Sequence, residues 1–260
     1  MSSTASSLAG IKTSGSEERA DGKLPWMVTV VAVIVAAVGL GTYRWYQNTY
    51  SFTVGMDSFE PEFQVYWMRL LYWQLAIIIL AGGGYNAYLW LTRPAADDVM
   101  SPVEEFNIYK RIFAILAAVG IIAPTAIMLF MEADAAWHQI TIRDTDFTPT
   151  HIGLFYFFMP LMVAGIFTAF MWMHTRLPDF RDRISLPMGI LLMGPVLIMP
   201  NVGFNEWGHT FFYAEELFAA PIHWGFVALG WGFFGVAGLM VQIMSRMAKL
   251  VRLTGPEASA

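Results

Sequence analysis

The sequence predicts an all-α integral membrane bundle of about six transmembrane helices with a disordered N-terminal tail. Of its 260 residues, 57% are apolar and only 13% are charged, whereas a soluble domain carries about 25% charged residues. The mean hydropathy is +0.52. Such a surface would aggregate in water, which excludes an ordinary cytosolic enzyme and a disordered chain. The net charge of −5 offers no basic patch, so no nucleic-acid partner is expected.

Six apolar stretches long enough to cross about 30 Å of hydrocarbon follow one another along the chain. Residues 1–23 are rich in Ser, Ala and Gly and are predicted to be a disordered tail. Residues 24–250 are expected to form one transmembrane helical domain, and residues 251–260 a flexible C-terminus. All the spans are predicted as helices, because lipid cannot satisfy the edges of an open sheet. They are placed at Leu24–Tyr43, Tyr66–Leu91, Ile112–Met131, Ile152–Met173, Leu186–Phe204 and Leu217–Met244.

The first span has two interpretations. Val28–Val38 has a suitable length for the apolar core of a signal peptide, and small residues follow it. The stretch runs on into Tyr43, Arg44 and Trp45, which are typical of an anchor at the membrane interface rather than of a cleavage site. We therefore expect an uncleaved helix.

The basic residues predict how the bundle is oriented. With six spans, both termini and the second and fourth loops share one side of the membrane. Only Arg44, Arg69 and Arg143, of fifteen Lys and Arg residues, fall on the opposite side. Cytoplasmic segments carry an excess of Lys and Arg, so both termini are predicted to be cytoplasmic.

The histidines are sorted in the opposite way. Four of the five, His138, His151, His209 and His223, fall at the outer ends of the last four spans. Ionisable groups at membrane depth are costly and by default indicate an ion path, a proton relay or a metal site. The chain has no cysteine, so thiolate ligands are excluded. The fifth, His174, lies at the inner end and is interpreted as an interfacial polar residue.

The spacing around the first two histidines predicts a first metal site. Asp134 and His138 are four residues apart, so they lie on one helix face, one turn apart. His151 follows after a short connection, at the start of the returning helix. Two His and one carboxylate suit Zn, Cu or non-haem Fe(II). The plainer interpretation is that Asp134 caps its helix or pairs with Arg143.

The same arrangement recurs as a second metal site. Asn205 and His209 are again four residues apart, and His223 follows at the start of the next span. With no anionic ligand this set should hold a metal less tightly, and copper with an open position would suit a reactive centre. Alternatively, Asn205 satisfies a helix end broken near Pro200.

Longer motifs around both sites resemble a known family. The similar segments include Asp134–Gln139, Ile142–His151, Leu197–His209, Glu215–Phe226, Gly55–Phe63 and Thr175–Pro178. From about Tyr43 to about Gln242 the sequence resembles the C subunit of the copper membrane monooxygenases. This family comprises particulate methane monooxygenase, ammonia monooxygenase and related short-chain hydrocarbon monooxygenases.

The resemblance implies one of three subunits of a trimer of heterotrimers, embedded in the lipids of a bacterial inner (cytoplasmic or intracytoplasmic) membrane. Such a complex hydroxylates a small hydrocarbon or ammonia with O2, and quinol is the expected electron donor. The first site matches the family's copper or zinc site in this subunit. The second site matches a neighbouring copper site, which makes Asn205, His209 and His223 the candidate catalytic residues.

The sequence also departs from the family pattern. Met131-Glu132-Ala133 stands where Thr-Glu-Gln is usual, Phe204 replaces a leucine, and the segment Phe211–Ala214 is changed. All six ligand positions are intact, so the changes bear on the substrate and favour a hydrocarbon over ammonia.

Three other functions stay open at this point. A haem-carrying subunit of a quinol-linked oxidoreductase would show a Soret band. A proton or metal transporter would move ions without consuming O2. A scaffold that binds metal without catalysing a reaction would have no activity of its own.

Overall fold

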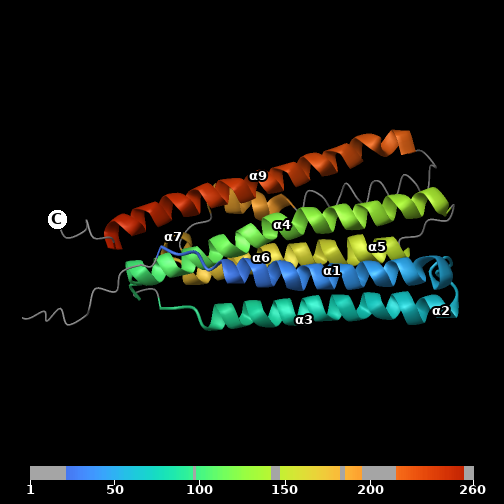
Figure 1. Cartoon of the computed structure of the whole chain (residues 1–260), viewed down its shortest axis with the longest axis horizontal. Coiled ribbons are helices and arrows are strands. Elements are labelled where there is room, and N and C mark those ends of the chain that lie inside the picture. The colour runs from blue at the N-terminus through green and yellow to red at the C-terminus, as the bar shows by residue number, and fades with distance from the viewer. Residues whose placement is uncertain (1–21, 96–97, 142–146, 182–184, 195–214, 255–260) are drawn as a thin grey trace, which may run out of the picture.

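The computed structural model describes residues 22–95, 98–141, 147–181, 185–194 and 215–254. All regular structure in these ranges is helical, which confirms the predicted all-α membrane bundle. Its long helices run side by side (Figure 1). Both α1 and α9 pack against α4, and α3 packs against α6. Their bounds are α1 Trp26–Val54, α3 Arg69–Leu91, α4 Pro102–Ile140, α6 Met159–Arg176 and α9 Glu215–Thr254.

Two of these helices are preceded by short additional turns. α2 (Pro61–Phe63) and the π-helical turn η1 (Gln64–Met68) lead into α3. In the same way, α5 (Pro149–Gly153) and the π-helical turn η2 (Leu154–Phe158) lead into α6. Each run begins with a proline at the first turn, where the missing N–H costs nothing. A short helix α7 (Pro178–Arg181) follows α6.

Within the described residues, five helical stretches are long and apolar enough to cross a membrane, so the chain is a multi-pass membrane protein. The predicted fifth span is helical over residues 186–194, and its remainder lies outside the described residues. The five stretches are Trp26–Val54, Pro61–Leu91, Pro102–Trp137, Pro149–Arg176 and Gly232–Leu253.

The helices extend well beyond the predicted spans. α4 has 39 residues, which makes it about 58 Å long and about twice the hydrocarbon thickness. α1 continues through Tyr43, Arg44 and Trp45 to Val54, beyond the predicted end of the first span at Tyr43. α9 continues to Thr254, past the predicted domain boundary at residue 250. The predicted tail at residues 1–21 lies outside the described residues.

Helix α1 buries polar side chains and exposes apolar ones. The buried residues of α1 are all polar, namely Thr29, Gln47 and Ser51, whereas Val30, Ile34 and Val35 on the same helix are exposed. Thr29 donates a hydrogen bond to the backbone carbonyl of Ala114 on α4 at 2.7 Å. This pattern suits a lipid environment, where interhelical hydrogen bonds and close packing hold helices together.

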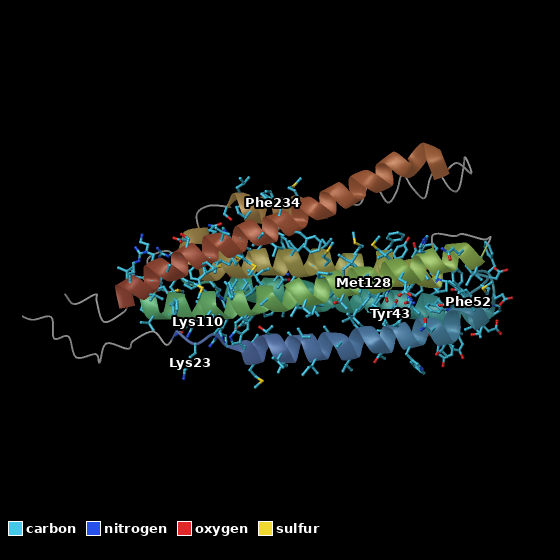
Figure 2. The ribbon with its side chains drawn as sticks, turned by 45° about the horizontal axis from the view of Figure 1, so that its top comes forward. Lys23, Tyr43, Phe52, Lys110, Met128 and Phe234 are labelled. Carbon is cyan, nitrogen blue, oxygen red and sulfur yellow. The ribbon has the colours of Figure 1, made fainter. Side chains whose placement is uncertain are left out.

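The two ends of the bundle collect different segments. One end of the bundle contains the starts of α1 and α4 and the ends of α3, α6 and α9 (Figure 1). Most of the basic residues of the described chain lie at this end. We call it the basic end; Figure 2 shows Lys23 and Lys110 towards it. The opposite end, which we call the histidine end, holds the end of α4 and the start of α5. Which of the two faces the cytoplasm stays a prediction.

Candidate metal site at the histidine end

The last turns of α4 meet the first turn of α5 at the histidine end. Thr148 is the N-cap residue of α5, and its hydroxyl accepts a hydrogen bond from the backbone N–H of His151 at 3.1 Å. A side-chain cap of this kind satisfies a donor that the first helical turn leaves free. Pro149 takes the following position. The cap thereby fixes the direction in which the side chains of Thr150 and His151 project from the first turn of α5.

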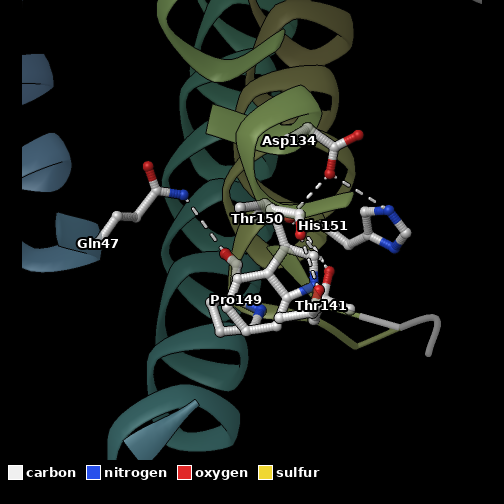
Figure 3. Close-up of polar contacts among 8 residues, drawn as sticks. Gln47, Asp134, Thr141, Pro149, Thr150 and His151 are labelled. Atoms are coloured by element: carbon white, nitrogen blue, oxygen red, sulfur yellow. Dashed lines mark hydrogen bonds and ion pairs between the residues drawn. The ribbon is translucent and has the colours of Figure 1, made fainter. Parts of the chain in front are cut away.

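Thr150 and His151 both reach Asp134 on α4, as Figure 3 shows. The Thr150 hydroxyl donates to Oδ1 of Asp134 at 2.8 Å. Nε2 of His151 lies 3.4 Å from the same oxygen. The Asp134 and His151 contact joins two residues predicted as ligands of the first site, from two antiparallel helices.

The site is shielded from solvent. The His151 side chain is 1% exposed and that of Asp134 is 19% exposed. The imidazole packs on the ring of Phe155, with 4.8 Å between ring centroids. Burying an ionisable pair is expensive unless it is compensated. A carboxylate and an imidazole held together in this setting therefore indicate a functional role.

The separation of Oδ1 and Nε2 fits a bound metal ion. A hydrogen bond between nitrogen and oxygen typically measures about 2.7–3.2 Å, so a direct contact at 3.4 Å is at most a weak one. Two ligand atoms at about 2.1 Å from a tetrahedral ion lie about 3.4 Å apart. The donor set, a carboxylate oxygen and an imidazole nitrogen, also suits zinc or copper.

Two buried glutamines hold the segment that carries His151. Gln74 on α3 donates to the carbonyl of Ile152 at 3.0 Å and accepts from the Tyr43 hydroxyl at 3.3 Å. Gln47 on α1 donates to the carbonyl of Pro149 at 3.4 Å. Sequence reasoning missed both glutamines and Thr150. Amides inside apolar spans were the available signal, because buried polar groups need partners.

Gly153 allows α1 to approach α5 this closely. A Cβ at this position would lie 2.5 Å from Nε2 of Gln47 and 3.1 Å from Cε1 of Tyr43. Any larger residue would therefore displace Gln47, which binds the α5 backbone, and Tyr43, which donates to Gln74.

The structure describes the first predicted site in part. His138 lies on α4 one turn beyond Asp134, on the same face, but its side chain is outside the described part of the chain. Among the described residues, no group of three or more His, Asp or Glu side chains forms a metal cluster. Asp134 and His151 are the two predicted ligands that the structure brings together.

The second predicted site lies largely outside the described residues. Asn205 and His209 belong to residues 195–214, which the structure does not describe. His223 belongs to α9, which begins at the histidine end, but its side chain is not described. The ligand roles of all three stay predictions.

His174 has the polar role that the sequence predicts for it. Its Nδ1 donates to the carbonyl of Phe180 at 2.9 Å, and its ring stacks on Phe170 with 5.5 Å between centroids. It lies at the end of α6, at the basic end. A backbone partner and a ring partner together account for this histidine.

Comparison with known protein families identifies the family of the chain. The family model that describes the C subunit of ammonia monooxygenase and methane monooxygenase matches residues 11–254, which is nearly the whole chain. No curated protein matches the sequence. The matched range includes every predicted metal ligand. The chain therefore belongs to the family of ammonia monooxygenase/methane monooxygenase C subunits and is one component of a multi-subunit monooxygenase.

Proposed function

We propose that this chain is a metal-binding subunit of a copper-dependent monooxygenase that hydroxylates a short-chain hydrocarbon such as methane. Asp134, His138 and His151 would hold copper or zinc in the first site. The second site, Asn205, His209 and His223, would hold copper and carry the reaction with O2. The observation that supports the proposal is the 3.4 Å separation of Asp134 Oδ1 and His151 Nε2, two side chains that are 19% and 1% exposed.

The residues of the first site have separate tasks. Asp134 supplies negative charge, which offsets part of the charge of a divalent ion. His151 supplies a neutral nitrogen donor on a rigid first turn of helix. Phe155 covers the imidazole and limits the access of water. Copper, when bound, supplies a one-electron redox change that none of these side chains can provide.

A hydrocarbon substrate suits both the setting and the sequence. Methane and its homologues dissolve in lipid, so they reach a membrane-embedded subunit by partitioning. The changes at Met131-Glu132-Ala133 lie on the turn of α4 that precedes Asp134. Met131 and Ala133 are the changed positions, and Ala133 is buried. The residues that differ from the ammonia and methane pattern therefore lie next to a proposed ligand.

The proposal includes the assembly and its location. Two other monooxygenase subunits would complete a heterotrimer, three of which would associate in a bacterial inner membrane. The exposed apolar residues of α1 and α3, such as Val35 and Leu80, offer surface for lipids and for these partners. Quinol would supply the electrons, and both termini would face the cytoplasm.

The intact complex tests the proposal through metal content and substrate turnover. We expect His209→Ala to remove one copper per chain and abolish hydroxylation with O2. Asp134→Ala and His151→Ala should each remove one metal ion from the first site. The panel of substrates is methane, ethane, butane and ammonia.

Several outcomes would contradict the proposal. An assembled His209→Ala complex that hydroxylates at the wild-type rate would remove the catalytic role of the second site. Faster turnover of ammonia than of any hydrocarbon would identify an ammonia monooxygenase subunit instead. A Soret band would favour a haem-carrying subunit, and ion flux in liposomes without O2 consumption would favour a transporter.

A further inference from the structure

The first turn of α5 contains a chain of three hydrogen bonds that ends on Asp134. The backbone N–H of His151 donates to the Thr148 hydroxyl at 3.1 Å. The hydroxyls of Thr148 and Thr150 lie 3.3 Å apart. The Thr150 hydroxyl donates to Oδ1 of Asp134 at 2.8 Å.

Only one direction of donation satisfies all three contacts. A hydroxyl carries a single proton, and Thr150 uses its proton on the carboxylate. The proton between the two hydroxyls must then come from Thr148, whose oxygen already accepts the helical N–H. The chain therefore runs from the His151 N–H through Thr148 and Thr150 to Asp134. Each bond in such a chain polarises the next, which strengthens the last one.

Neither hydroxyl can be replaced by solvent in this position. Thr148 and Thr150 are each 4% exposed. If a buried acceptor loses its donor, no water replaces that donor, and the unsatisfied acceptor destabilises the folded state. The orientation of the Asp134 carboxylate is thus fixed by the first turn of α5, the same turn that presents His151.

We propose that Thr150, supported by Thr148, is a positioning residue that sets the metal affinity of the first site. This inference rests on the proposed function, because it requires a metal ion at Asp134 and His151. Thr150 donates to the same oxygen that faces His151 Nε2. It restricts rotation of the Asp134 carboxylate, so this side chain loses less conformational entropy when the ion binds. Partners that orient metal ligands in this way typically contribute about 10–100-fold to affinity.

The experiment compares four variants in the intact complex. Thr150→Val removes the hydroxyl and keeps the shape, whereas Thr150→Ser keeps a hydroxyl. Thr175→Val is the matched control, because Thr175 is equally buried and its hydroxyl donates to the Met171 carbonyl at the basic end, at 2.7 Å. Asp134→Ala defines which metal ion belongs to the site. Dissociation constants for Zn²⁺ and Cu²⁺ are measured by competition with a chelator, without reference to activity.

We expect Thr150→Val to raise the dissociation constant of that one ion by about 10–100-fold. Thr150→Ser should restore most of the affinity, and Thr175→Val should bind as the wild type does. Copper bound at the site should also show a changed electron paramagnetic resonance spectrum in Thr150→Val. If that variant fails to assemble, Thr148→Val removes only the upstream hydroxyl and should give a smaller loss of affinity.

The results separate this inference from the function on which it rests. If Asp134→Ala loses no metal, the first site itself is wrong. If Asp134→Ala loses metal but Thr150→Val or Thr148→Val binds it at the wild-type affinity, the positioning role is overturned. An equal loss in Thr175→Val would also overturn it, because the effect would then reflect general loosening of the bundle.

Discussion

The two ends of the bundle use similar side chains in different ways. At the basic end, Arg246 on α9 makes two 2.8 Å hydrogen bonds to the Glu105 carboxylate on α4 and lies 3.3 Å from Asp179. At the histidine end, Asp134 is contacted by a threonine hydroxyl, and an imidazole nitrogen lies 3.4 Å from it. The contacts at the basic end have the geometry of charge-assisted hydrogen bonds. At the histidine end, an oxygen and a nitrogen atom lie at the spacing expected for two ligands of one metal ion.

The two histidines repeat the contrast. His174 at the basic end has a carbonyl partner at 2.9 Å and an aromatic ring beside it. His151 also has a ring beside it, but its Nε2 lies 3.4 Å from the Asp134 carboxylate, which is the spacing of two ligand atoms on one tetrahedral ion. Burial of a histidine therefore does not by itself identify a metal site. The distance between its ring nitrogen and a second candidate ligand atom is the more informative observation. The same residue type is structural at one end and a candidate ligand at the other.

The largest effect should come from breaking the ion pair at the basic end. Glu105→Ala removes the partner that forms both short bonds to Arg246 and is itself 5% exposed. Arg246 is partly exposed and keeps Asp179 at 3.3 Å, so the loss of two charge-assisted bonds should cost about 2–3 kcal/mol and lower the thermal unfolding midpoint of the complex. Metal content per folded chain should not change.

Glu104→Ala is the matched control for this prediction. Glu104 is exposed on the same first turn of α4, so its loss should cost less than about 1 kcal/mol. Loss of metal in Glu105→Ala would break the comparison, because the basic end would then contribute to the metal site.

The boundaries of the fold could be predicted from the sequence only where lipid determines them. Hydropathy identifies the hydrocarbon-crossing part of α4, but Ser101 caps that helix before Glu104 and Glu105, well outside the apolar stretch. The end at Ile140 is likewise beyond it. Helix propagation past the hydrocarbon depends on caps and on packing against neighbours, neither of which produces an apolar run.

The sequence could predict that Asp134 and His151 lie close together, but not which residues hold them in place. The spacing of Asp134 and His138 and the position of His151 follow from helix periodicity, and the structure places Asp134 and His151 together. Gln74 and Thr150 act across helices, so their partners depend on how the helices pack. No periodic pattern within one segment contains that information.

A middle-sized effect should follow from the loss of an amide at the histidine end. Gln74→Leu leaves the Ile152 carbonyl and the Tyr43 hydroxyl without their partner. The loss of both hydrogen bonds should cost about 1–2 kcal/mol, less than the loss at the basic end, because the 3.3 Å bond from the Tyr43 hydroxyl is long. Because Ile152 follows His151, the segment should loosen and metal should dissociate faster during chelator challenge.

Asn86→Leu gives the matched control. Gln74 joins α3 to α5, whereas Asn86 joins α3 to α6 by donating to the Thr168 hydroxyl at 2.9 Å. It should lower thermal stability by a similar amount and leave the rate of metal dissociation unchanged. Equal rates of dissociation in the two variants would show that any weakening of the contacts of α3 releases metal.

The smallest effect is expected at His174, where the comparison is sharpest. His174→Ala removes one hydrogen bond and one ring contact at the basic end, which should cost about 1 kcal/mol. Thermal unfolding of the intact complex measures this cost, and metal analysis of the same samples should give the wild-type content. His174→Phe keeps the ring beside Phe170 and separates the stacking contribution from the hydrogen bond. Loss of a metal ion in either variant would mean that a completed hydrogen bond does not distinguish a structural histidine from a ligand in this protein.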